Sequence, residues 1–194
     1  MANTLDRRAA VKSLLSNRGD MLVLTGLGGT CWDAAAAGDD PLTFYLWGAM
    51  GGAAMVGLGL ALAQPGQPVV VVTGDGEMLM GIGGFATIAQ LLPPNLTIVV
   101  LDNGSYGETG GQPSHTAGPT DLAAIARACG IPTTATLTTL EEVDRLTARL
   151  GRSDAGTSVS VIKIDPADAP RVLPSRDGAM VKSRLRAALG LESM

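Results

Sequence analysis

The 194-residue chain has few charged residues (16%) and few aromatic residues (3%). Its net charge is −4, and its Lys and Arg residues are scattered except near the C-terminus, which argues against a nucleic-acid partner. Only two cysteines are present, Cys31 and Cys129, and they form no CxxC motif. Zinc and iron–sulfur sites are therefore not expected on this chain, and we expect both cysteines to be structural.

Long hydrophobic runs are also missing. The most apolar segment, residues 48–63, carries no charge but is too short to span a bilayer comfortably and contains several glycines. The N-terminal segment lacks the apolar stretch of a signal peptide. We therefore expect a cytoplasmic protein with no membrane partner.

Hydrophobic residues, in contrast, make up 46% of the chain, together with 26 Gly. The length suits one domain, residues 1–194, with a substantial core. Because little polar surface remains for solvation, we expect part of the surface to be buried against another chain.

Short apolar runs alternate with helical patterns along the chain. The predicted strands are 21–25, 43–46, 69–72, 97–101, 133–137 and 159–164. The predicted helices are 5–15, 48–63, 82–92, 121–128 and 140–150. This alternation predicts an α/β fold: a doubly wound, mostly parallel sheet of about six strands with helices on both faces. Residues 104–119 are predicted to form a polar, glycine-rich functional loop.

Acidic and amide residues follow two of these strands. Gly74-Asp75-Gly76-Glu77 follows residues 69–72, and Asp102-Asn103 follows residues 97–101. Since the carboxyl ends of parallel strands meet at one edge of the sheet, Asp75 and Asn103 are expected to lie together. Their oxygens suit Mg²⁺, and the glycines beside Asp75 leave backbone N–H groups open to a phosphate. The pattern predicts a metal bound together with a diphosphate.

This pattern resembles the signature of thiamine diphosphate-dependent enzymes, in which GDG is followed, about this far along the chain, by an Asn at a strand end. Asn103 lies 28 residues after Asp75. The resemblance covers about residues 20–165 and implies the diphosphate-binding domain of that family. It implies that Asp75, Asn103 and the main-chain carbonyl of Ser105 bind Mg²⁺. The residues that it places around thiamine diphosphate are Gly48, Met50, Gly74, Asp75, Gly76, Glu77, Asn103, Ser105, Tyr106 and Gly107.

Two of these roles are specific. The N–H groups of Gly76 and Glu77 are expected to hold the diphosphate. In the segment Gly48-Ala49-Met50-Gly51, the resemblance implies that the Gly48 carbonyl accepts a hydrogen bond from the aminopyrimidine and that Met50 bends the cofactor. The bend allows the cofactor to supply its own nucleophile.

The family also uses a pyrimidine-binding domain with a glutamate that assists the cofactor, and this chain is too short to include it. We therefore expect an α-type partner chain that carries this domain and its glutamate. The two chains are expected to form a hetero-oligomer with the active site between them.

The run Asn103 to Thr116, which includes Tyr106 to Pro113, resembles sulfopyruvate and phosphonopyruvate decarboxylases. This resemblance implies a 2-oxoacid decarboxylase, a carbon–carbon lyase, acting on a small 2-oxoacid. Within this run, Tyr106 to Gln112 also resembles β subunits of 2-oxoacid:ferredoxin oxidoreductases. A carboligase and a non-catalytic cofactor-binding subunit are further alternatives. We favour decarboxylation because two distant cysteines do not supply the ligands of an iron–sulfur cluster.

Other residues of the glycine-rich segments have open roles. His115, the only histidine, is either a catalytic group or an ordinary surface residue. Glu108 and Gln112 are candidates for contact with substrate or cofactor. Gly28 and Gly29 form either a second diphosphate-side turn or simply a tight connection between strand and helix.

Overall fold

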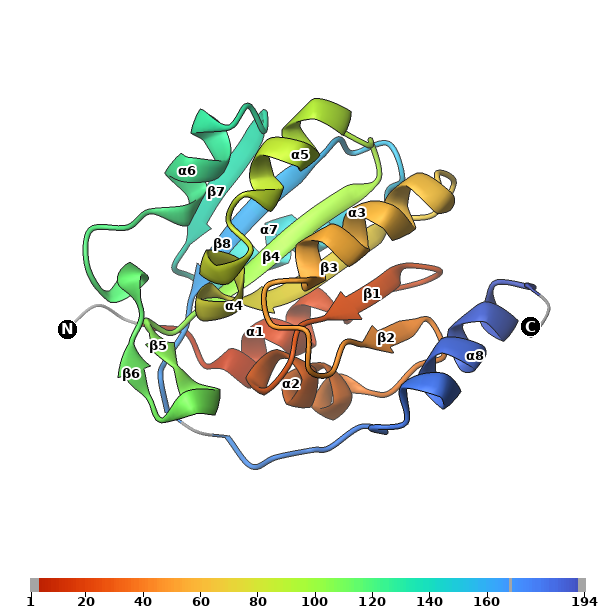
Figure 1. Ribbon diagram of the computed structural model, residues 1–194, viewed down its shortest axis with the longest axis horizontal. Coiled ribbons are helices and arrows are strands. Elements are labelled where there is room, and N and C mark those ends of the chain that lie inside the picture. Colours follow the sequence, from red (N-terminus) through yellow and green to blue (C-terminus); the bar gives the residue numbers. More distant parts are fainter. Residues whose placement is uncertain (1–3, 168, 192–194) are drawn as a thin grey trace.

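Six parallel strands form the central sheet of the computed structural model, which describes residues 4–167 and 169–191 (Figure 1). Their order across the sheet is β2 (Thr43–Tyr45), β1 (Leu22–Thr25), β3 (Val69–Gly74), β4 (Leu96–Asp102), β8 (Ser158–Lys163) and β7 (Thr133–Leu137). All neighbouring pairs are parallel. The predicted fold class is confirmed.

Helices cover both faces of this sheet. One face packs against α3 (Ala53–Ala63), α5 (Gly84–Leu91), α6 (Leu122–Ala128) and α8 (Gly178–Ala188). The other face packs against α1 (Arg7–Leu14), α2 (Gly29–Ala37) and α7 (Leu140–Leu150). Strand β3 shows why both faces are apolar: Val69 and Val71 belong to the first core, and Val70 and Val72 to the second.

Some boundaries agree with the prediction and others do not. Strand β7 and helix α7 begin and end where predicted, and Thr139 closes a capping box at the start of α7. The apolar segment 48–63 is helical only from Ala53, because Gly48 and Gly51 have φ values of +75° and +92°. The predicted helix 82–92 is shorter, Gly84–Leu91.

Several elements were not predicted. Helix α4 (Asp75–Met80) starts directly at the acidic segment after β3. Segment 104–119 was predicted as a loop, but it contains a small two-stranded ladder, β5 (Ser105–Tyr106) with β6 (Gln112–Pro113), and two 3₁₀ turns, η1 (Gly107–Thr109) and η2 (His115–Ala117). After β8 the chain crosses the molecule to α8 (Figure 1). Arg184 of α8 forms an ion pair with Asp39, with Nη1 and Oδ2 2.6 Å apart.

None of the helices in the described part of the chain has the length and apolarity that crossing a membrane requires.

Candidate functional site

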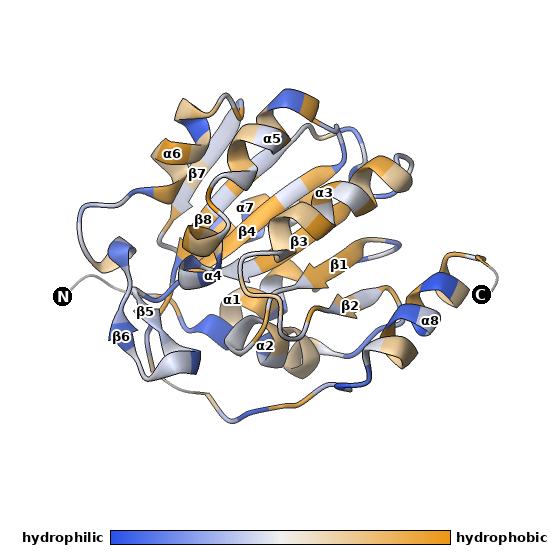
Figure 2. Cartoon of the chain, viewed as in Figure 1, coloured by the Kyte–Doolittle hydropathy of each residue, from blue (hydrophilic) through white to orange (hydrophobic). Residues whose placement is uncertain are grey.

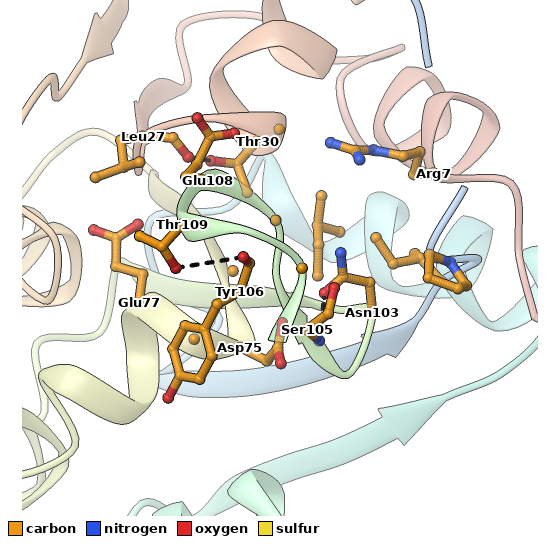
Figure 3. A pocket seen from close by; sticks show the side chains of 18 of the residues that line it. Arg7, Leu27, Thr30, Asp75, Glu77, Asn103, Ser105, Tyr106, Glu108 and Thr109 are labelled. Carbon is orange, nitrogen blue, oxygen red and sulfur yellow. Dashed lines mark hydrogen bonds between the residues drawn. The ribbon is translucent and has the colours of Figure 1, made fainter. Parts of the chain in front are cut away.

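A cavity of about 420 Å³ lies at the carboxyl ends of β1, β3 and β4 (Figure 3). The chain runs from β1 to β2 on one side and returns to β3 on the other, so β1 and β3 flank the point where the strand order reverses. Open α/β sheets bind ligands at this point. The wall comes from the turn after β1, the acidic segment after β3 and the chain that follows β4.

The cavity brings together nine of the ten residues that the sequence predicted around a cofactor. They are Met50, Gly74, Asp75, Gly76, Glu77, Asn103, Ser105, Tyr106 and Gly107. Gly48 is not part of the wall. Glu108 and Gly29 line the cavity, whereas Gln112 does not. His115 is exposed and lies outside the wall, so the structure does not place it for a catalytic role.

Asp75 is the first residue of α4 and is almost completely buried, with 2% of its surface exposed. Its Oδ2 accepts hydrogen bonds from the hydroxyls of Ser114 and Thr116, the latter at 2.9 Å. The Thr116 hydroxyl also lies 2.7 Å from Oδ1 of Asp102, which forms an ion pair with Lys163. One hydrogen on Thr116 therefore serves two buried carboxylates.

This arrangement leaves the acidic pair short of positive charge. Burial raises the pKa of Asp75; the hydroxyls of Ser114 and Thr116 oppose this shift, and the charge of Asp102 adds to it. Both side-chain hydrogen bonds to Asp75 go to Oδ2. A cation beside this carboxylate would relieve the repulsion between the two carboxylates, so the site fits a hard divalent metal.

Asn103 and Ser105 complete the oxygen-rich edge. Oδ1 of Asn103 accepts the N–H of Ser105 at 3.0 Å, and this short turn fixes the amide beside the cavity. An amide oxygen has a second lone pair, which remains available to a metal. Among the described residues no group of three His, Cys, Asp or Glu is placed to hold a metal ion. The oxygen set predicted from the sequence contains only one such residue, Asp75.

The β5–β6 segment lies close against the glycine turns of the cavity. A β-carbon at Gly76 would lie 2.5 Å from the Tyr106 ring, and one at Gly28 would lie 2.5 Å from the Glu108 carboxyl group. Gly28 also has a φ value of +70°, which disfavours any other residue. Glycine at these positions therefore allows the segment to close over the backbone N–H groups.

Glu77 lies at the other end of the cavity, beside Leu27 (Figure 3). Its side chain is buried, and neither carboxylate oxygen has a hydrogen-bond partner among the described residues. Burial raises the pKa of Glu77, and the nearby Thr73 hydroxyl and backbone N–H groups only partly oppose this shift. The predicted role of Glu77 involves its main-chain N–H alone and does not account for this carboxylate.

Several functional candidates were not predicted from the sequence. Arg7 reaches the cavity from α1, and Arg171 reaches it from the segment after β8, where its guanidinium stacks 4.4 Å from the Trp32 ring. Ser114 and Thr116 were treated only as loop residues. Their alternation around His115 is the one sequence signal for a shared inward face, because both are buried while His115 is exposed.

The parallel sheet and its cavity at the strand-order reversal define the class of the protein as an α/β ligand-binding domain. The sequence family described as "Thiamine pyrophosphate enzyme, C-terminal TPP binding domain" matches residues 30–164. The chain belongs to this family, which confirms the resemblance noted from the sequence.

Known proteins similar to this chain include two decarboxylases. The chain is 37% identical over 136 residues to sulfopyruvate decarboxylase subunit beta of Methanocaldococcus jannaschii, covering 70% of this chain and 71% of that protein. It is 38% identical over 186 residues to phosphonopyruvate decarboxylase of Streptomyces viridochromogenes, covering 93% of this chain and 45% of that protein. The chain thus spans less than half the length of some of the curated relatives that it matches.

Among solved structures, a thiamin diphosphate-dependent enzyme from Mycobacterium smegmatis superposes with a TM-score of 0.71 at 24% identity. The match covers 84% of this chain and 32% of that one. At this identity the likeness establishes the fold alone.

Proposed function

We propose that this chain is the β-type subunit of a thiamine diphosphate- and Mg²⁺-dependent decarboxylase that acts on a 2-oxoacid with a second acid group, such as sulfopyruvate or phosphonopyruvate. The observation that carries the proposal is the meeting of Asp75 and Asn103 at one cavity, where the buried Asp75 carboxylate lies near the charge of Asp102. The decarboxylase relatives support this choice of reaction.

In this proposal, Asp75, Asn103 and the main-chain carbonyl of Ser105 would hold Mg²⁺ next to the diphosphate. The N–H groups of Gly76 and Glu77, at the start of α4, hold the diphosphate oxygens. The N-terminal end of a helix favours anions because its first N–H groups lack partners within the helix. Met50, which lines the cavity, would provide apolar support for the cofactor.

When bound, thiamine diphosphate supplies the carbon nucleophile and the electron sink for decarboxylation. The chain's own contribution is to hold the diphosphate end and to cover it. Tyr106 and Glu108 close over the glycine turns, which limits the access of water to the metal. In this proposal, a partner chain completes the substrate end of the cavity.

Apolar residues on the outer surface of α3, α4 and α5 are evidence for this partner chain. Helix α3 has no charged or polar side chain on any side, a pattern typical of buried helices. Figure 2 shows the apolar colouring along α3. Several large apolar residues of these helices and their ends are nevertheless exposed, namely Met55, Val56, Leu62, Met80, Leu91 and Leu92. We propose that an α-type chain covers this surface and brings a pyrimidine-binding domain with its glutamate.

The ferredoxin oxidoreductase alternative requires several thiolates around a cluster. Cys31 packs in the core on one face of the sheet and Cys129 against the core on the other. These two cysteines therefore do not converge on one cluster. A carboligase differs from a decarboxylase only in the fate of the product carbon, so products separate these two reactions.

The test is co-expression with a chain that carries a pyrimidine-binding domain. We expect a stable complex that releases CO₂ and an aldehyde from sulfopyruvate or phosphonopyruvate, whereas the chain alone shows no turnover. An Asp75→Asn complex, which assembles but lacks the metal-binding carboxylate, is the control. Equal turnover by the isolated chain, or a reaction that requires ferredoxin, would contradict the proposal.

A further inference from the structure

Arg7 lies in the cavity wall although it belongs to the first helix of the chain. Leu5 forms a parallel bridge with Ile164, just beyond β8, which places the start of α1 at the carboxyl edge of the sheet. The Asp6 side chain caps α1 by accepting the N–H of Ala9 at 2.7 Å. These contacts fix the position of Arg7, the first residue of the helix, beside the cavity.

An internal carboxylate orients the Arg7 side chain. Nε of Arg7 donates to Oδ2 of Asp33 at 2.7 Å, and Arg8 forms an ion pair with Oδ1 of the same residue. Only 10% of the Arg7 side chain and 1% of the Asp33 side chain are exposed. Because two guanidinium groups share one carboxylate, this cluster has a net charge of +1.

The outer nitrogens of Arg7 remain available. Arg7 makes one hydrogen bond to the described residues, and its Nε is the donor. Glu108 also lines the cavity, but no ion pair in the described part of the chain joins it to Arg7. A β-carbon at Gly29 would overlap the Arg7 guanidinium, so the group lies directly against the start of α2. Figure 3 shows it at the opposite end of the cavity from Glu77, with Asn103 and Ser105 between them.

We propose that Arg7 binds an oxyanion, a phosphate, phosphonate or sulfonate group, that enters this end of the cavity. A guanidinium held by a buried carboxylate presents its remaining N–H groups in a fixed fork, which suits such groups. The start of α2, at Gly29 and Thr30, adds N–H groups beside it. The inference rests on the proposed function for the identity of the anion, which comes either from the cofactor's diphosphate or from the second acid group of the substrate.

Arg8 provides a matched control. It pairs with the same Asp33, but its other contact is with the carbonyl of Pro170 in the segment after β8, and it does not line the cavity. Arg7→Met and Arg8→Met each remove one positive charge from the same cluster. The two variants therefore have equal net charge, and a difference between them reports direct contact with the anion.

The test measures binding of inorganic diphosphate, and then of thiamine diphosphate, to the full chain in the presence of Mg²⁺ by titration calorimetry. If the anion is the diphosphate, Arg7→Met weakens both affinities by about ten- to a hundredfold, whereas Arg8→Met changes them by less than about threefold. Arg7→Lys keeps the charge but loses the fork, and an intermediate affinity is expected. Thermal unfolding of all three variants checks that the fold is kept.

If the anion is the substrate's acid group, the assembled enzyme shows the effect instead. Arg7→Met then raises KM for sulfopyruvate or phosphonopyruvate but not for pyruvate, with cofactor affinity unchanged. Wild-type behaviour of Arg7→Met in both experiments would overturn the inference, as would equal losses in Arg8→Met. Binding of inorganic diphosphate that depends on Arg7, without binding of thiamine diphosphate, would instead contradict the proposed function and leave the role of Arg7 intact.

Discussion

The hydroxyl of Thr116 is the most informative single group to remove. It lies 2.9 Å from Oδ2 of Asp75 and 2.7 Å from Oδ1 of Asp102, and it has only one hydrogen to donate. Valine has nearly the same shape but no hydroxyl. Hydrogen bonds to charged groups contribute about 1.5–3 kcal/mol, so Thr116→Val is expected to lower the free energy of unfolding by about that amount in metal-free buffer. Because this bond also orients the proposed metal ligand, Mg²⁺-dependent cofactor affinity is expected to fall by about 10- to 100-fold.

Thr147→Val is the matched control. Thr147 is as buried as Thr116, with 8% of its surface exposed in each case, but its hydroxyl lies 3.0 Å from the carbonyl of Val143 and 3.2 Å from that of Ser13. Loss of a bond to such neutral acceptors costs about 0.5–1.5 kcal/mol and is not expected to change cofactor binding. Urea denaturation and calorimetry measure both quantities. Equal effects of the two substitutions would refute the role assigned to Thr116.

Three further outcomes are expected. Gly76→Ala is predicted to leave thermal stability nearly unchanged but to displace the Tyr106 ring, which calorimetry should register as weaker cofactor binding. Burial raises the pKa of Cys31 to about 12, so an alkylating reagent at mildly alkaline pH should modify the half-buried Cys129 alone, and two modified thiols would contradict this. The pKa of Glu77 is raised above its ordinary value of 4.5, so the folded state binds this proton more tightly than the unfolded chain, and stability should fall as the pH rises above that value. Glu77→Gln should flatten this decline above pH 4.5 in urea denaturation, and an unchanged slope would argue against a raised pKa of this buried carboxylate.

Strong local signals explain how much of the fold the sequence predicted. Uninterrupted β-branched runs such as β3 and the amphipathic pattern of α7 leave little choice of structure. Glycine-rich segments were not recognised as regular structure. Helix α4 begins in a Gly-Asp-Gly run and is followed by Gly81, and such glycines are typical of turns. The β5–β6 ladder depends on glycines with positive φ, Gly110 and Gly111, which local propensity does not distinguish from a flexible loop.

Some residues of the candidate site could likewise be predicted from the sequence, and others could not. Asp75 and Asn103 follow predicted strands, and parallel strands bring their carboxyl ends together, so the sequence was enough to bring these residues to one edge. Arg7 and Arg171 come from outside the predicted core, and only long-range packing places them. His115 shows the converse: a residue of suitable chemistry in a functional segment still points to solvent when its neighbours Ser114 and Thr116 face inward.

The central proposal is that Asp75 and Asn103 hold Mg²⁺. The measurement that tests it is calorimetric titration of thiamine diphosphate into the wild-type chain and the Asp75→Asn variant, each with Mg²⁺ and with a chelator. We predict that the wild-type chain binds the cofactor only with Mg²⁺ and that the variant binds poorly in both buffers. Equal wild-type affinity with and without Mg²⁺, or full Mg²⁺-dependent binding by the variant, would contradict it.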